Sequence, residues 1–416
     1  MTMRNEFDRT LTAWLNAERP AVAPDRLIDE VLYEVARTGR RPGWLVLDRW
    51  TWTAMATRLW SVSRATALVV VVMLLIAALI ALVVLAGGPR PAPPFGLTRA
   101  GYIAFDTPEG VVLAHGDGSD RHLLVPAEGQ TVSPTWSRDG LNLSFWHRPE
   151  PSAPWDLVVV DAAGENRRVL AEEVTLRDRE AALNQPSNLS WSPDGRAIAF
   201  AADVGTSSAI FVADLETRST RQIVDEDLRA VDPAWAPDGS VIAFQSEAGM
   251  SLHVVAPDGS GVRQLGWLTG TFLWPEWSPD GSAIAVAADV GGNADIFTIS
   301  ANGSVVTNIS NNPAPDMSPS WSPDGSRLAW GRAMGQGTRA WVVVANADGS
   351  GQVQLEDPAD LAPPTWSPDG TRLFSYVVGD DNEFQSLLVL DPAGVAPALM
   401  VPAEGNLGNG NWQRLP

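Results

Sequence analysis

One short phrase recurs through most of the chain and constrains its fold more than any other feature. The phrase joins a Trp, a Ser, a Pro-Asp-Gly turn signal and a short apolar run. Its six copies read PTWSRDGLNLSF at Trp136, LSWSPDGRAIAF at Trp191, PAWAPDGSVIAF at Trp235, PEWSPDGSAIAV at Trp277, PSWSPDGSRLAW at Trp321 and PTWSPDGTRLFS at Trp366. The Trp residues are 55, 44, 42, 44 and 45 positions apart. This period predicts an array of equivalent supersecondary units.

Each copy predicts two strands around a tight turn. The first strand ends at Trp-Ser, Pro fixes φ and Gly supplies a positive φ in the turn, and an alternating apolar strand returns. The turn Asp is expected to accept hydrogen bonds within its own turn. Runs such as 209–224 and 251–266 add a third and a fourth strand around a second turn. Four strands in roughly 45 residues make one β-propeller blade.

The two ends of the repeat region determine the number of blades. The first unit starts at Gly101–Phe105 (GYIAF) without a preceding Trp phrase. The chain ends with a lone Asn411-Trp412-Gln413, 46 residues after Trp366. We therefore expect the C-terminus to supply the missing innermost strand of the first blade, which closes the ring and hides its edge strands. The sequence predicts an all-β fold, a seven-bladed β-propeller over residues 99–416.

The repeated W-S-P-D-G phrase resembles the WD-like repeat of TolB-type bacterial β-propellers over residues 99–416. The resemblance implies an extracytoplasmic interaction module in the bacterial envelope. A Trp repeated once per blade is typical of packing between blades, so we interpret this set as structural repeat residues and not as an aromatic binding platform. The set comprises Trp136, Trp191, Trp235, Trp277, Trp321, Trp366 and Trp412.

An apolar, uncharged run at residues 65–88 predicts a transmembrane helix, because about 24 residues at ~1.5 Å each span the ~30 Å hydrocarbon layer. Six Arg residues between 37 and 64 precede the run, and only Arg90 and Arg99 follow it closely. The positive-inside rule then places the N-terminus in the cytoplasm and the propeller outside. The sequence thus predicts a single-pass protein of the bacterial cytoplasmic membrane, with a Pro-rich linker at residues 89–98.

The N-terminal residues predict a small helical part inside the cell. Apolar stripes in residues 1–43 indicate two short amphipathic helices. Residues 44–64 are rich in Trp and Arg, which is typical of a neck at the membrane interface. This arrangement resembles that of transmembrane anti-sigma factors, which implies a cytoplasmic regulator such as a sigma factor as partner. A passive anchoring role for the segment is the alternative.

The connections opposite the Trp-phrase turns are the longer ones, and they are the expected location of a binding site. They combine aromatic side chains with carboxylates, a combination able to attract a cation or a basic peptide through focused negative potential. Solvated loop acids that keep the domain soluble are the alternative explanation. The ligand-binding candidates are Asp203, Asp289, Asp380, Asp381, Glu383, Trp155, Trp267 and Trp274.

Composition and motifs narrow the functional classes. After residue 64 the chain carries 19 basic residues against 41 acidic ones, which disfavours a nucleic-acid partner. The chain contains no Cys, and its four His residues do not have the spacing of metal ligands. It contains no nucleophile-elbow motif and no phosphate-binding loop motif. The sequence therefore predicts no catalytic residue, metal or cofactor. We expect a protein- or glycan-binding sensor module, with a passive envelope scaffold or a propeller lyase or glycosidase as alternatives.

Overall fold

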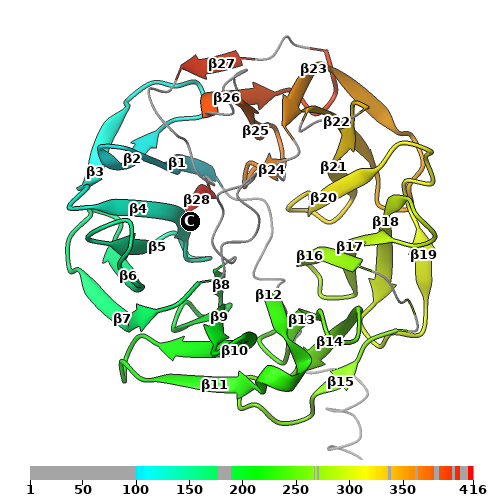
Figure 1. Ribbon diagram of the computed structural model, residues 1–416. Helices are drawn as coiled ribbons and strands as arrows, with labels where there is room; N and C mark the ends of the chain where they lie inside the picture. The colour runs from blue at the N-terminus through cyan, green and yellow to red at the C-terminus, as the bar shows by residue number, and fades with distance from the viewer. Residues whose placement is uncertain are drawn as a thin grey trace, which may run out of the picture. The chain divides into compact units, whose positions relative to one another are not determined.

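Seven four-stranded antiparallel sheets form a closed ring in the computed structural model (Figure 1). The structure describes residues 99–176, 189–266, 268, 271–335, 339–360, 364–378, 384–395, 399–402 and 411–415. The ring confirms the predicted seven-bladed, all-β propeller. Blade 1 consists of β28 (Asn411–Leu415), β1 (Arg99–Thr107), β2 (Gly110–Ala114) and β3 (His122–Pro126).

The other six blades follow in chain order, each with its innermost strand first (Figure 1). Blade 2 comprises β4 (Gln130–Trp136), β5 (Asn142–Arg148), β6 (Trp155–Asp161) and β7 (Arg168–Val174). Blade 3 comprises β8 (Ser190–Trp191), β9 (Ala197–Val204), β10 (Ser207–Asp214) and β11 (Thr220–Val224). Blade 4 comprises β12 (Ala230–Trp235), β13 (Ile242–Ser246), β14 (Ser251–Val255) and β15 (Arg263–Gln264), and a 3-10 turn, η3 (Glu226–Leu228), precedes it.

Blades 5 to 7 complete the ring. Blade 5 comprises β16 (Thr271–Trp277), β17 (Ala283–Asp289), β18 (Ala294–Ser300) and β19 (Val306–Asn308). Blade 6 comprises β20 (Asp316–Trp321), β21 (Arg327–Ala333), β22 (Arg339–Asn346) and β23 (Val353–Asp360). Blade 7 comprises β24 (Thr365–Trp366), β25 (Leu373–Val378), β26 (Phe384–Leu390) and β27 (Leu399–Pro402).

The last strand closes the ring as predicted. Strand β28 pairs with β1 in antiparallel register, with Arg99 opposite Leu415 and Ile103 opposite Trp412. Gln413 strengthens the closure, because its side-chain amide donates to the Gly140 carbonyl of blade 2 at 3.0 Å. The first and last strands of the propeller thus share one sheet, and the inner edge of β1 is covered by β28.

Apolar side chains fill the junctions between blades. A cluster of buried residues occupies each of the seven junctions, and each cluster contains one Trp of the repeat set. The second strand of a blade is packed on both faces, so Ala199, Phe200 and Ala201 of β9 are all at most 4% exposed. This differs from the predicted alternation, because a blade inside a ring has a neighbour on either side.

The W-S-P-D-G phrase forms the predicted turn. In blade 3 the Gly195 N–H donates to the Ser192 carbonyl at 3.0 Å, and Gly195 adopts a positive φ of 69°. Asp194 accepts from the Ser192 hydroxyl at 2.6 Å and from the Arg196 N–H at 3.1 Å. At the other copies the turn Asp again accepts within its own turn, from the Ser hydroxyl or, in blade 4, from the Ser240 N–H, which confirms the role predicted for the turn Asp.

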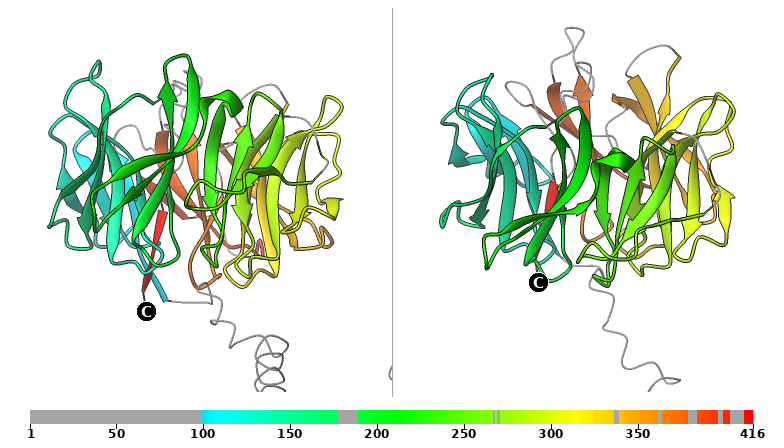
Figure 2. Two further views of the ribbon diagram at one scale, coloured as in Figure 1. Left: turned by 90° about the horizontal axis from the view of Figure 1, so that it is seen from below. Right: turned by 60° about the horizontal axis from the view of Figure 1, so that its bottom comes forward.

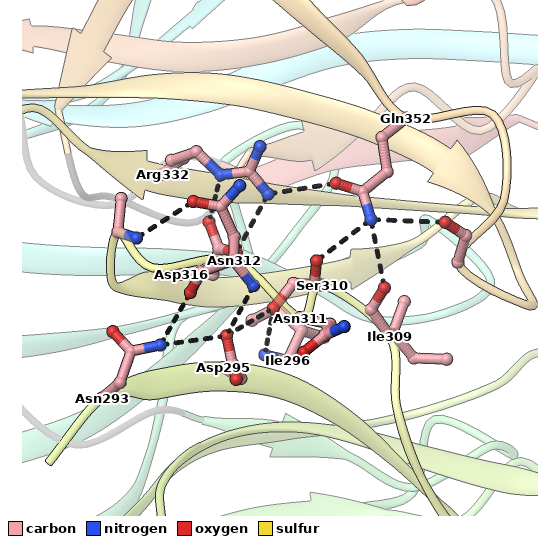
Figure 3. Close-up of polar contacts among 12 residues, drawn as sticks. Asn293, Asp295, Ile296, Ile309, Ser310, Asn311, Asn312, Asp316, Arg332 and Gln352 are labelled. Atoms are coloured by element: carbon pink, nitrogen blue, oxygen red, sulfur yellow. Dashed lines mark hydrogen bonds and ion pairs between the residues drawn. The ribbon is translucent and has the colours of Figure 1, made fainter.

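A polar network joins blades 5 and 6 near the end of β19 (Figure 3). Asp316, which is 0% exposed, accepts from the Arg332 guanidinium at 2.8 and 3.0 Å. Arg332 also donates to the Gln352 side chain at 3.1 Å, and Gln352 in turn donates to the Ile309 and Ser310 carbonyls. The buried ion pair of blade 6 is thereby tied to the backbone of blade 5.

The segments that precede the propeller fall outside this description. The predicted span at 65–88, the segments 1–43 and 44–64 and the linker 89–98 all lie outside the described residues. Within the described ranges, no helix has the length and hydrophobicity of a membrane span. The chain divides into two units, residues 1–88 and residues 89–416.

Candidate functional site

The propeller has two distinct faces. The turns within the Trp phrases and the turns between third and fourth strands lie on one face, which we call the short-turn face. The chain enters β1 and leaves β28 at this face, since Arg99 pairs with Leu415, and Figure 2 shows the C-terminus there. The longest connection between strands, from β7 to β8, lies on the opposite face, which we call the long-loop face, although the two-residue turns after β1 and β9 lie there too. A ligand on the long-loop face therefore approaches from the side opposite to the chain's entry.

The structure does not bring the predicted acidic residues together. Asp203 is half-buried at the end of β9 in blade 3, and Asp289 is exposed at the end of β17 in blade 5. All of blade 4 lies between them in the ring. Asp289 accepts from the Gly292 N–H at 2.8 Å, so it orders its own turn. Asp380, Asp381 and Glu383 lie outside the described residues.

The predicted aromatic candidates have different surroundings. Trp155 is 7% exposed and packs in the junction between blades 2 and 3, with the Arg148 guanidinium 4.2 Å from its ring centre. Trp274 is half-buried within β16 and adopts a positive φ of 52° at a β-bulge. Trp267 lies outside the described residues. Trp155 thus contributes to the core and not to an exposed binding surface.

Asp203 borders a groove at the junction of blades 2 and 3. The groove has a volume of about 680 Å³, and Phe200 and Phe211 stack in its wall with ring centres 5.6 Å apart. Glu172 and Glu173 of β7 are exposed along it, and Arg218 is the single basic residue among the described lining groups. The groove therefore combines an aromatic wall with excess negative charge, which suits a partner with basic and apolar side chains.

Two backbone-linked contacts hold the walls of this groove. The Asp203 N–H donates to the Thr175 carbonyl at 2.8 Å, and the Thr220 hydroxyl donates to the Leu170 carbonyl at 2.9 Å. Both bonds cross from blade 3 to blade 2. The groove is consequently preformed by the packing of two blades and does not depend on a single loop.

A second cavity lies in the central channel at the short-turn face. It has a volume of about 370 Å³, and each of the seven blades contributes to its wall through the end of its innermost strand. The Trp residues of the repeat set border it, yet each is between 2% and 8% exposed. Their rings are directed mainly into the blade junctions, where they belong to the apolar clusters.

Hydrogen bonds from the indole groups link successive blades. The Trp277 N–H donates to the Ala234 carbonyl at 3.1 Å, and the Trp366 N–H donates to the Ser320 carbonyl at 3.2 Å. In both cases the acceptor precedes the Trp of the previous blade. The Trp191 N–H reaches Thr135 in the same way and also the Ser144 hydroxyl at 3.0 Å. The Trp136 N–H, by contrast, has no partner within the described part of the chain.

This difference gives a matched pair of substitutions. Trp191→Phe removes a donor with two acceptors, whereas Trp136→Phe removes a donor without a partner among the described residues. Both changes remove the same ring volume, so we expect Trp191→Phe to lower the free energy of unfolding by roughly 1–2 kcal/mol more than Trp136→Phe. Urea unfolding monitored by circular dichroism measures both values. Equal losses would contradict a stabilising role for the inter-blade bonds.

Three charged side chains border the channel cavity, and none was predicted as a site residue. Arg138 of blade 2, Glu276 of blade 5 and Arg414 of blade 1 are the charged groups among its described lining residues. Burial lowers the pKa of Arg138 to about 10, and the neighbouring Arg414 charge acts in the same direction. The sequence did contain a signal, because Arg138 interrupts the W-S-P-D-G phrase as W-S-R-D-G.

Glu276 is an acidic residue whose side chain bonds to the next blade. Desolvation raises its pKa to about 8, while hydrogen bonds from the Trp321 N–H and the Ser320 hydroxyl, and the Arg138 charge, oppose the shift. Ser190 occupies the equivalent place in blade 3 and accepts from the Trp235 N–H at 2.8 Å. Burial therefore favours the protonated form of Glu276, and its side chain takes part in inter-blade bonding.

The raised pKa predicts a pH-dependent stability. Between its unfolded pKa of ~4.5 and about 8, folded Glu276 binds a proton that the unfolded chain has lost, so stability falls as pH rises. The slope is at most about 1.4 kcal/mol per pH unit. Glu276→Gln mimics the protonated form, and we expect its stability to decline less between pH 5 and 8. Chemical unfolding at a series of pH values tests this, and parallel profiles for both proteins would contradict it.

Known proteins are similar to this chain in sequence and in fold. The sequence matches the TolB beta propeller domain over residues 97–271 and 259–389. TolB from Acinetobacter baumannii is 17% identical with a TM-score of 0.51, covering 75% of this chain and 66% of that one. Oligogalacturonate lyase from Vibrio parahaemolyticus is 15% identical with a TM-score of 0.51, covering 73% and 86%. Puromycin hydrolase is 16% identical with a TM-score of 0.52, covering 76% and 55%. No curated protein matches the sequence.

Proposed function

Because the chain belongs to the TolB β-propeller family, we propose that it is a membrane-anchored extracytoplasmic interaction module whose long-loop face binds an envelope protein or glycan. The observation that carries the proposal is the separation of the two faces. The chain enters the propeller at the short-turn face, and the groove beside Asp203 is bordered by β7, which leads into the longest connection between blades. The long-loop face is therefore the face away from the strand end at which the chain enters the propeller.

The charge of the groove indicates the kind of partner. Glu172, Glu173 and Asp203 outnumber Arg218, and the half-buried Phe211 offers apolar surface. A protein segment with basic and apolar side chains satisfies both features, so we favour a protein over a glycan at this groove. Exposed carboxylates contribute mainly to association rate and specificity, which makes the interaction sensitive to salt.

Crosslinking and pull-down from native membranes tests the proposal. The full chain is compared with a triple variant, Glu172→Gln, Glu173→Gln and Asp203→Asn, and with Glu165→Gln, which removes an exposed acid from the short-turn face. We expect the triple variant to lose most of the captured partner and Glu165→Gln to retain it. Equal capture by all three proteins would place the interaction elsewhere.

We also propose a cytoplasmic role for the N-terminal residues. The apolar run at 65–88 supports a single span, and residues 1–43 would then report to, or hold, a cytoplasmic regulator of the sigma-factor kind. Replacing residues 1–43 by an unrelated sequence separates a signalling role from a passive scaffold. Loss of a specific intracellular partner supports signalling, and an unchanged set of partners supports a scaffold.

A carbohydrate-active lyase is the second candidate, and Glu276 is the observation that favours it. A carboxyl group with a raised pKa, in a cavity that two guanidinium groups also border, suits proton transfer to or from an acidic sugar. A glycosidase needs a pair of carboxyl groups, and the described lining of this cavity supplies one. Incubation with uronate oligosaccharides tests this candidate, since elimination yields an unsaturated product that absorbs ultraviolet light.

A further inference from the structure

Two adjacent blades depart from the repeat at the same position. The position is the second residue after the repeat Trp. Five blades have a Pro there, whereas blade 2 has Arg138 and blade 1 has Arg414. The five residues that keep the repeat are Pro193, Pro237, Pro279, Pro323 and Pro368. Because the position borders the channel cavity, both Arg side chains reach the same space at the short-turn face.

Close packing of blades 1 and 2 fixes this pair. Gly140, in the turn that follows Arg138, has a positive φ of 71°, and a Cβ there would lie 2.0 Å from the Arg414 carbonyl oxygen. The Gln413 side chain donates to the Gly140 carbonyl at 3.0 Å. Arg138 in turn donates through Nη2 to the Trp235 carbonyl of blade 4 at 2.8 Å, which holds its guanidinium over the cavity. The two cations therefore sit on a rigid scaffold.

The charge of the cavity is opposite to that of the protein. Its described lining contains two Arg residues and one Glu, while the whole chain has a formal charge of −20. Burial raises the pKa of Glu276, which reduces the negative charge that it contributes to the cavity. Burial lowers the pKa of both Arg138 and Arg414, and a bound anion favours their charged forms.

We propose that the channel mouth at the short-turn face binds a phosphate group through the guanidinium groups of Arg138 and Arg414. Inorganic phosphate carries between one and two negative charges at pH 7 and a lipid phosphodiester carries one, but both present several oxygens that two guanidinium groups can share, whereas a carboxylate presents two. The planar guanidinium forks also match the spacing of phosphate oxygens. A cavity of about 370 Å³ accommodates a phosphate with a small attached group. This site is separate from the groove beside Asp203, so either assignment stands without the other.

The phosphate has two possible sources, free phosphate or a phospholipid head group, and the experiment separates them. The full chain is titrated with inorganic phosphate by calorimetry, and it is also floated with phosphatidylglycerol vesicles and with phosphatidylcholine vesicles. Acetate is the comparator anion. The variant Arg138→Pro restores the residue that five blades carry, so it is compatible with the fold, and Arg263→Gln removes an exposed Arg elsewhere as a control.

We expect Arg138→Pro to weaken phosphate binding roughly tenfold or more, and Arg263→Gln to leave it unchanged. Binding of inorganic phosphate supports a free ligand, and binding of phosphatidylglycerol vesicles alone, again lost in Arg138→Pro, supports a lipid head group. Failure to bind either probe overturns the proposal. Equal binding by the full chain and Arg138→Pro, or acetate affinity equal to that of phosphate, also overturns it.

Discussion

Deletion of residues 411–416 is expected to abolish cooperative folding of the propeller. Strand β28 supplies the inner edge of blade 1, and its loss leaves the backbone of β1 unpaired between Arg99 and Ala104. Trp412, which is 5% exposed, packs against Phe374 of blade 7 with ring centres 5.9 Å apart. Truncation of such a Trp alone costs about 3–5 kcal/mol, a large share of the ~5–15 kcal/mol that stabilises a typical domain.

Limited proteolysis and urea unfolding measure this effect. The truncated chain is expected to be cleaved rapidly under conditions in which the full chain resists, and to lose its sharp unfolding transition. A chain shortened by Pro416 alone is the matched control, because β28 ends at Leu415. A truncated chain that unfolds with the midpoint and slope of the full chain would show that the ring closes without β28.

The blade count and the ring closure were predictable because they depend on a local period. Each Trp phrase contains the residues that form its own turn. The first unit (GYIAF) lacks an innermost strand and the C-terminal Asn411-Trp412-Gln413 is a strand without a unit, so the second is expected to complete the first. The bulges of the innermost strands were not predicted. Ser133, Asp232, Trp274 and Ser318 each precede a Pro and adopt a positive φ, a conformation that the residue types do not indicate.

The candidate sites were less predictable, because they depend on how distant segments meet. Matching positions such as Asp203 and Asp289 looked like parts of one ring, but repeat symmetry places them in different blades and keeps them apart. Arg138 and Arg414 are far apart in sequence, and ring closure brings them to one cavity. The sequence shows that both residues replace a Pro of the repeat. That they border one cavity follows only from the pairing of β28 with β1.

The ion pair between Asp316 and Arg332 gives the second large expected effect. Asp316→Leu leaves the Arg332 guanidinium, whose side chain is 12% exposed, without its carboxylate partner. Loss of one partner of a buried pair costs about 3–5 kcal/mol, because the remaining charge stays desolvated. The substitution also weakens the connection through Gln352 to blade 5 (Figure 3). We therefore expect Asp316→Leu to lower the midpoint of urea unfolding strongly.

Two further variants show whether the buried charge itself is responsible. The double variant Asp316→Leu with Arg332→Met removes both charges, and we expect it to recover most of the lost stability, since an apolar pair of similar volume replaces a buried ion pair at little cost. Glu247→Gln is the surface control: its partner Arg229 lies 3.5 Å away with a side chain 51% exposed, so the expected loss is below about 1 kcal/mol. If the double variant were as unstable as Asp316→Leu, the loss would come from the leucine's shape and not from the isolated Arg332 charge.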